Sequence, residues 1–139
     1  LLVAFMNSKA ISADVSPVLH PLHKDLHDST NAAQLGKGVI IMKYGGRGGK
    51  YHTSEASAEY MAWIRKILDK RNIPWQPGTM GKVDIGGGGT IAVFLAQRGI
   101  EVVDMGPGVL AMHSPYELTN KADLYATYLA YKAFYEETD

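Results

Sequence analysis

The chain has 139 residues, enough for one domain with a substantial core, and 46% of them are hydrophobic, which is typical of a globular protein. Lys and Arg number 14, as do Asp and Glu, so the chain lacks the basic excess of nucleic-acid-binding proteins. It contains no cysteine, which excludes disulfides and thiolate metal ligands and suits a cytoplasmic protein. Its apolar runs are far shorter than a membrane span, so we expect no membrane partner.

The chain opens with six apolar residues and no initiator methionine. Domains rarely begin with such a segment, so we expect residues 1–7 to be the end of a helix that starts earlier. On this interpretation, residues 1–139 are the C-terminal portion of a longer protein. The opening segment also lacks the basic start and the cleavage pattern of a signal peptide.

Apolar runs and helical spacing predict the elements in chain order. Strands are expected over residues 9–15, 38–43, 73–76, 100–105 and 109–112. Helices are expected over residues 55–70, 90–97 and 121–137, with a shorter helix opening at Ser114. This alternation predicts an α/β fold with a central, largely parallel or mixed sheet flanked by helices.

Local signals mark the ends and faces of these helices. Thr53 or Ser54 can cap the helix over residues 55–70. Ser114 and Glu117 have the spacing of a capping box, with Pro115 at the first helical position. The helical period predicts two sets of buried side chains: Tyr60, Met61, Ile64, Ile67 and Leu68 in the first long helix, and Leu124, Tyr128, Tyr131 and Phe134 in the last.

Two residues that can bind a metal, Asp14 and His113, stand where strands are expected to end. Ligands collect at such strand ends, and an acid in an apolar strand is costly unless it is paired or binds a metal. We therefore predict that the two residues meet at one metal site, of which a carboxylate and an imidazole make half. The alternative is that Asp14 caps a turn and His113 is a hydrogen-bonded core histidine.

A polar loop over residues 16–36 carries three histidines, His20, His23 and His27. Their spacing could place all three on one face only in a helix, and Pro21 interrupts it. We therefore expect a mobile loop beside an active site rather than a self-contained three-histidine metal site.

Two glycine-rich runs could approach a ligand. Residues 45–50 fail the phosphate-loop pattern, because Tyr44 replaces its first glycine and Tyr51 replaces the Ser or Thr after its lysine. Residues 86–90 are expected to open a helix, where free N–H groups could hold an anion or a carbonyl oxygen. Close approach of this loop to the sheet is an equal alternative.

Four further residues have two interpretations each. Lys43, at the end of a buried strand, and Tyr51, after the glycine turn, could hold a substrate carboxylate, or they could be a surface lysine and a packed tyrosine. Glu136 and Glu137 resemble the paired glutamates of metallopeptidases, but they end the last helix and are expected to be solvated.

Taken together, the motifs resemble one known family over essentially the whole chain. In order, they are Ser12-Ala13-Asp14-Val15-Ser16 with His20-Pro21, the run Gly36 to Lys43, Asp84 leading to Gly88-Gly89-Thr90-Ile91, and Val103-Asp104-Met105-Gly106 with Leu110-Ala111-Met112-His113-Ser114. This pattern resembles the C-terminal half of the catalytic domain of the aminopeptidase I and aspartyl aminopeptidase family of zinc exopeptidases. The Ala-Asp and Ala-Met-His-Ser elements are the specific ones.

The resemblance implies a three-layer α/β domain with two zinc ions per active site, for which manganese or cobalt could substitute. It implies that Asp14 binds one metal and His113 the other. It also implies that substrate-binding groups match this chain at Lys43, Tyr51, His20, Gly88 and Thr90. Three departures stand out: Leu22 follows His20-Pro21 where the family usually has Asn, Gly89 replaces a Ser or Thr, and the turn before Tyr51 is longer.

The other metal ligands and the general-base glutamate of such enzymes lie upstream and have no match here. The implied activity is hydrolysis of an acidic or neutral N-terminal residue from peptides by metal-activated water. The resemblance also implies a large homo-oligomer. The alternative function is a non-catalytic α/β module that binds a ligand or supports assembly.

Overall fold

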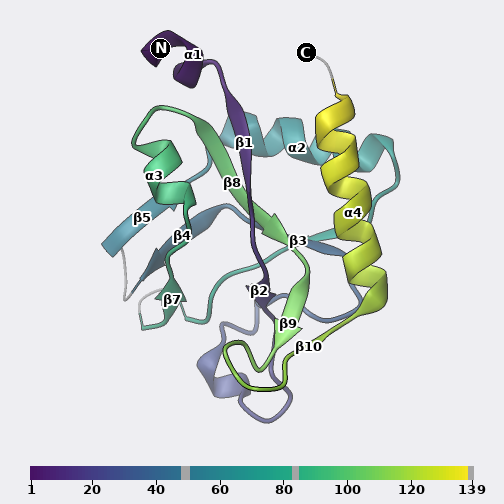
Figure 1. Ribbon diagram of the computed structural model, residues 1–139. Coiled ribbons are helices and arrows are strands. Elements are labelled where there is room, and N and C mark those ends of the chain that lie inside the picture. Colours follow the sequence, from purple (N-terminus) through teal and green to yellow (C-terminus); the bar gives the residue numbers. More distant parts are fainter. Residues whose placement is uncertain (48–50, 83–84, 138–139) are drawn as a thin grey trace.

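The computed structural model describes residues 1–47, 51–82 and 85–137 (Figure 1). Its central sheet has four strands in the order β1 (Lys9–Ala13), β8 (Glu101–Gly106), β3 (Val39–Met42) and β6 (Trp75–Pro77). The outer pairs, β1 with β8 and β3 with β6, are parallel, and the inner pair is antiparallel. The sheet is therefore mixed, which confirms the expected fold class.

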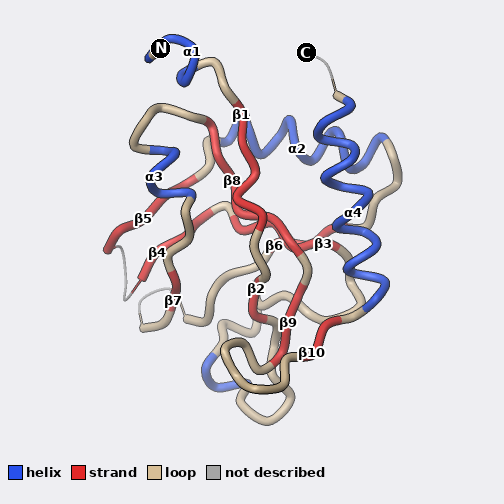
Figure 2. The backbone as a smooth tube through the Cα atoms, viewed as in Figure 1, coloured by secondary structure: helices blue, strands red, loops and turns tan. Residues whose placement is uncertain are grey.

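Two small sheets flank the central one, and Figure 2 shows their short strands in red. One has the order β5 (Tyr51–Glu55), β4 (Tyr44–Arg47) and β7 (Gly87–Gly88). The other has the order β10 (Leu118–Thr119), β9 (Gly108–Leu110) and β2 (Ser16–Pro17). The short strand β2 directly continues the path of β1, with Asp14 and Val15 between them.

Helices α2 (Ala58–Lys70) and α4 (Lys121–Glu136) pack on one face of the central sheet, whose apolar residues there include Val39, Ile41 and Val103. The alternate residues Ile40 and Met42 face a second core cluster on the other side. The shorter helices are α1 (Leu2–Met6), the 3₁₀ helix η1 (Lys24–Leu26) and α3 (Ala92–Ala96).

The inward face of α2 is largely as predicted, because Tyr60, Ile64, Ile67 and Leu68 are buried. Its start was predicted too early. The N-cap is Ser57, whose hydroxyl accepts a hydrogen bond from the backbone N–H of Tyr60 at 3.1 Å. Residues 51–55 form strand β5 instead, paired antiparallel with β4.

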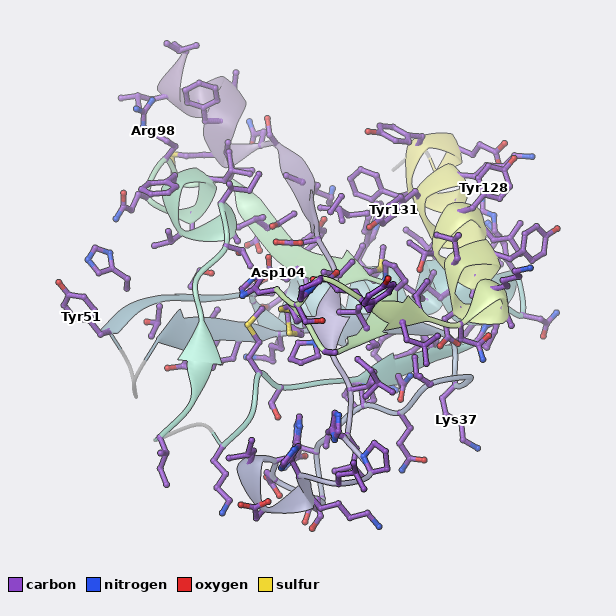
Figure 3. All side chains as sticks on the ribbon, turned by 60° about the horizontal axis from the view of Figure 1, so that its bottom comes forward. Lys37, Tyr51, Arg98, Asp104, Tyr128 and Tyr131 are labelled. Atoms are coloured by element: carbon purple, nitrogen blue, oxygen red, sulfur yellow. The ribbon has the colours of Figure 1, made fainter. Side chains whose placement is uncertain are left out.

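The inward face of α4 agrees with the prediction only in part, because Tyr131 and Phe134 pack against the core whereas Leu124 and Tyr128 do not. Its buried residues are Asp123, Ala126, Thr127, Ala130 and Ala133. Leu124 and Tyr128 are exposed, and Figure 3 shows Tyr131 on the side toward the sheet and Tyr128 pointing away from it. The Tyr131 hydroxyl donates a hydrogen bond to the Met105 carbonyl at 2.6 Å. Alanines allow the helix to lie close to the sheet, and Leu124 and Tyr128 point outward.

The helix predicted at Ser114 does not form. Ala111 and His113 have positive φ values of 57° and 66°, so the chain turns sharply between β9 and β10. The side chains of Ser114 and Glu117 still bond to nearby backbone, but these bonds close a turn: Glu117 accepts from the His113 N–H, and Ser114 donates to the Tyr116 carbonyl.

Within residues 1–47, 51–82 and 85–137, no helix has both the length and the apolar character needed to cross a membrane.

Candidate active site

Asp14 lies just beyond the end of β1, on the connection to β2. Its carboxylate is exposed, and its Oδ1 accepts a hydrogen bond from the N–H of Val15 at 2.8 Å. The expectation that Asp14 lies inside an apolar strand is therefore wrong. The exposed position leaves the carboxylate free to face a ligand.

An open cavity of about 490 Å³ brings three of the predicted site residues together, namely Asp14, Tyr51 and Thr90. One wall comes from β5, with Tyr51 and His52, and the other comes from residues 89–94. Tyr51, Ile91 and Phe94 are all more than 60% exposed, so both walls present apolar surface to the cavity. Figure 3 shows Tyr51 at the end of β5.

His113 lies in the turn between β9 and β10 and is exposed. A positive φ is uncommon for a residue with a side chain, so this turn holds the histidine in a strained backbone conformation. His113 is not among the residues that line the Asp14 cavity. In the part of the chain that the structure describes, no group of three or more His, Cys, Asp and Glu residues could hold a metal. These residues therefore supply at most part of a metal site.

Lys43 has a partner in its own chain. Its ammonium forms an ion pair with the carboxylate of Glu55, the last residue of β5, and both side chains are substantially exposed. Lys43 is not among the residues that line the Asp14 cavity.

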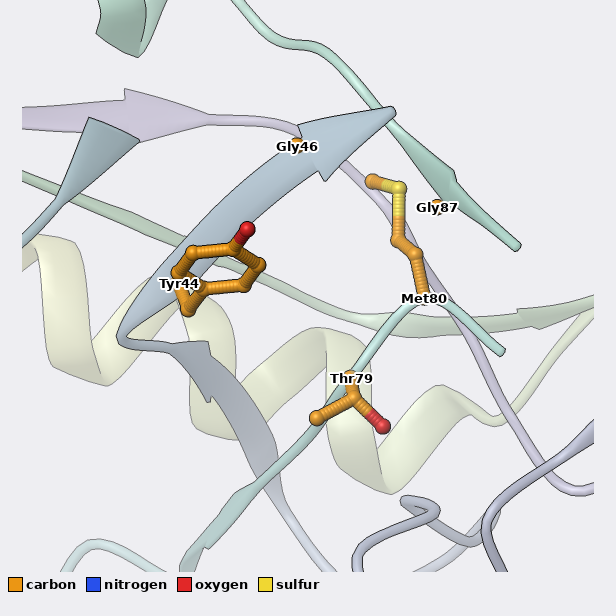
Figure 4. A pocket seen from close by; sticks show the side chains of 5 residues that line it. All are labelled: Tyr44, Gly46, Thr79, Met80 and Gly87. Atoms are coloured by element: carbon orange, nitrogen blue, oxygen red, sulfur yellow. The ribbon is translucent and has the colours of Figure 1, made fainter. Parts of the chain in front are cut away.

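Gly88 lies in β7 opposite Gly46 of β4. A Cβ at Gly88 would lie 2.5 Å from the sulfur of Met80, so a larger residue there would require the flexible Met80 side chain to move. Figure 4 shows Met80 between β4 and β7, beside a cavity of about 10 Å³ that has room for a single water molecule. The segment 87–88 is a strand, and α3 begins only at Ala92, so the predicted helix start at residue 90 was wrong. Gly86 and Gly88 lie close to Met80 and Lys82, whereas a Cβ at Gly89 would meet nothing within 4 Å, so both interpretations of this glycine run stay predictions.

His20 lies in the long loop before η1, with its ring centroid 4.9 Å from that of His23. Its Nδ1 accepts a hydrogen bond from the N–H of Leu22 at 3.2 Å. Burial, followed by the nearby His20, lowers the pKa of His27 below its ordinary value. No metal-binding cluster includes these histidines in the described segments.

Asp104, for which no role is predicted from the sequence, is 2% exposed in the middle of β8. Its Oδ1 accepts a hydrogen bond from the Thr90 hydroxyl at 2.6 Å. Burial raises the pKa of Asp104, while the neighbouring hydroxyls of Ser12 and Thr90 oppose that rise. The signal was present, because Asp104 is an acid inside an apolar strand, the argument that was applied to Asp14.

Two of the predicted motifs include residues outside those that the structure describes. Residues 48–50 of the first glycine run and Asp84, which leads to the second, lie beyond the described segments.

Comparison with known proteins places this arrangement in one family. The family model described as aminopeptidase I zinc metalloprotease (M18) matches residues 1–135. A probable M18 family aminopeptidase 1 from Borreliella burgdorferi (strain ZS7) is 58% identical over 134 residues, which are 96% of this chain and 29% of that protein. The chain therefore spans less than a third of that relative's length.

Solved structures of M18 aminopeptidases superpose closely on this chain. The crystal structure of an M18 aminopeptidase from Thermotoga maritima superposes with a TM-score of 0.94 at 50% identity, over 99% of this chain and 30% of that one. Aminopeptidase I from Clostridium acetobutylicum superposes with a TM-score of 0.90 at 44% identity, over 95% and 29%. The sequence motifs and the mixed sheet thus agree with the match of the family model, and the chain belongs to the aminopeptidase I (M18) family of zinc metalloproteases.

Proposed function

We propose that this chain is the C-terminal portion of the catalytic domain of a metal-dependent aminopeptidase, which removes the N-terminal residue from peptides. The observation that carries the proposal is the open cavity that joins Asp14 to Tyr51 and Thr90. It offers a concave surface with a carboxylate at one side and apolar walls, which suits the end of a peptide chain. The family match over residues 1–135 supports the same activity.

The donors of Asp14 and His113 fit zinc, because carboxylate oxygen and imidazole nitrogen are among its usual ligands in proteins. Both residues are exposed, and the Asp14 Oδ1 already accepts the Val15 N–H, which orients the carboxylate. In the proposed enzyme each residue holds one of two ions, and the remaining ligands and a general-base glutamate come from outside these residues. When bound, zinc would lower the pKa of water and polarise the scissile carbonyl, and manganese or cobalt could substitute.

Binding of the substrate is assigned to the cavity walls. Tyr51 and Thr90 contact the N-terminal residue of the substrate. The backbone around Gly88 supports the wall that contains Thr90. His20 belongs to the loop that we place beside the metals.

Two observations favour a neutral over an acidic N-terminal residue. The ammonium of Lys43 is neutralised by Glu55. The described residues that line the cavity include Tyr51, Ile91 and Phe94 but no Lys or Arg.

The test measures metal content and aminopeptidase activity in the full-length protein, as wild type and as Asp14→Ala. Glu59→Ala is the matched control, because Glu59 is an exposed acid on α2 that does not line the cavity. We expect Asp14→Ala to lose bound metal and turnover and Glu59→Ala to retain both. A wild-type protein that has no metal and no activity after addition of zinc, manganese or cobalt would favour the non-catalytic binding module.

A cytoplasmic location and self-association into a large homo-oligomer complete the proposal and rest on the family resemblance. Light scattering of the purified full-length protein tests the self-association.

A further inference from the structure

Asp104 occupies the centre of the mixed sheet. Its strand, β8, lies between β1 and β3, and its partners in register are Ser12 and Met42. Its neighbours Val103 and Met105 belong to the core under α2 and α4, so the Asp104 side chain points to the opposite face. None of the ion pairs among the described residues includes this carboxylate. A buried carboxylate without a cation is costly and calls for an explanation.

Thr90 provides the first part of that explanation. Its hydroxyl donates its single hydrogen to Asp104 Oδ1 at 2.6 Å and accepts a hydrogen bond from the N–H of Ala92 at 3.2 Å. The N-cap of α3 is Ile91, which makes no side-chain capping bond. The bond to Asp104 therefore ties the turn before α3 to the central sheet, and this turn forms one wall of the Asp14 cavity.

Gly45 provides the second part. A Cβ at this position of β4 would lie 3.1 Å from Asp104 Oδ2, so β4 passes directly against the carboxylate. Strand β4 pairs with β5, which carries Tyr51 and His52 on the other cavity wall. Thr90, on one cavity wall, and strand β4, which pairs with the strand of the other wall, therefore both contact the buried side chain of Asp104, which is labelled in Figure 3.

We infer that Asp104 is a positioning residue for the substrate cavity: through its hydrogen bond with Thr90 it holds the wall that contacts the N-terminal residue of a peptide. This inference rests on the proposed aminopeptidase function. The bond is fully formed without substrate, so it contributes to ground-state and transition-state binding alike. Its loss should therefore raise KM more than it lowers kcat.

The test compares three variants in the full-length protein. Thr90→Val removes the hydroxyl at nearly constant shape, and we expect KM to rise about tenfold with kcat within about twofold of wild type. Thr90→Ser restores the hydroxyl and should recover most of that loss. Thr127→Val is the matched control, because the Thr127 hydroxyl is also buried but bonds the Asp123 carbonyl on α4. It should leave KM unchanged.

Asp104→Ala, which removes the acceptor, completes a double-mutant cycle. In the Asp104→Ala background, Thr90→Val should add little to the rise in KM, because the bond is already lost. Additive effects, or a Thr90→Val enzyme with wild-type KM, would overturn the inference, and the Thr90 variants decide the matter if Asp104→Ala fails to fold. A wild-type enzyme without activity would reject the proposed function instead.

Hydrogen exchange gives a readout that needs no activity. Thr90→Val should speed amide exchange in residues 89–94, whereas Thr127→Val should not. Unchanged exchange there in Thr90→Val would count against the inference even in an inactive protein.

Discussion

The carbonyl of Asp14 lies directly against the α-carbon of Gly106. A Cβ built at Gly106 would lie 1.9 Å from the carbonyl oxygen of Asp14 and 2.8 Å from its carbonyl carbon. Gly106 ends β8 and Asp14 follows β1, its parallel neighbour in the sheet. This close approach fixes the point at which the chain leaves the central sheet and exposes the Asp14 carboxylate.

Gly106→Ala should therefore destabilise the protein by about 1–3 kcal/mol, as other overpacking substitutions do, because the Asp14 backbone must move. Urea unfolding measures the loss. Gly89→Ala is the control, since a Cβ there meets nothing within 4 Å, and it should cause no comparable loss. Equal stability of the two variants would show that the contact does not constrain Asp14.

Asp123 connects α4 to the loop before β3. Its two carboxylate oxygens accept the N–H groups of Gly36 at 2.7 Å and Gly38 at 2.8 Å, and the residue is 1% exposed. Asp123→Ala would leave both donors without this partner, so we expect a loss of about 2–4 kcal/mol in the free energy of unfolding. Asp123→Asn keeps one acceptor oxygen and should lose less. Thermal unfolding of both variants against wild type provides the measurement, and an alanine variant no less stable than the asparagine variant would contradict the expectation.

Much of this fold was predictable because local chemistry and tertiary structure agree. The four central strands are short apolar runs, and α2 has four buried residues at helical spacing. The candidate cavity was partly predictable, because Asp14, Tyr51 and Thr90 were singled out and lie together. The meeting of Asp14 with His113 at a metal stays a prediction.

The failures share a physical cause, which is that long-range contacts override local patterns. Periodicity cannot tell that α4 presents alanines to the sheet and turns Leu124 and Tyr128 to the surface. The capping signature at Ser114 is real, but the strand pairing of β9 with β10 requires a tight turn there, and the same side chains stabilise it.

Lys43→Met tests whether this lysine selects acidic substrates. The ammonium pairs with Glu55 on a substantially exposed surface, where ion pairs contribute about 0–1 kcal/mol, so stability should change little. The ratio of kcat/KM for an acidic over a neutral N-terminal residue should also stay unchanged in the full-length protein. A selective loss of activity on the acidic substrate would show that Lys43 leaves Glu55 to bind the substrate. Glu55→Gln is the matched control, because it removes the partner charge and retains the lysine.

The end of α4 should respond to pH through Glu137. Its carboxylate accepts from Arg71 at 2.7 Å and from Lys70 at 3.2 Å, and the bonds with Arg71 and then Lys70 lower its pKa below the ordinary value of 4.5. A lowered folded-state pKa means that this stabilisation is complete above the unfolded value and is lost as pH falls through the folded value. The difference in free energy of unfolding between wild type and Glu137→Gln should therefore be constant near pH 7 and shrink below about pH 4.5. In an Arg71→Gln background, Glu137→Gln should change the free energy of unfolding less at neutral pH. A difference between wild type and Glu137→Gln that grew in acid would refute the assignment of this stabilisation to the Glu137 pair.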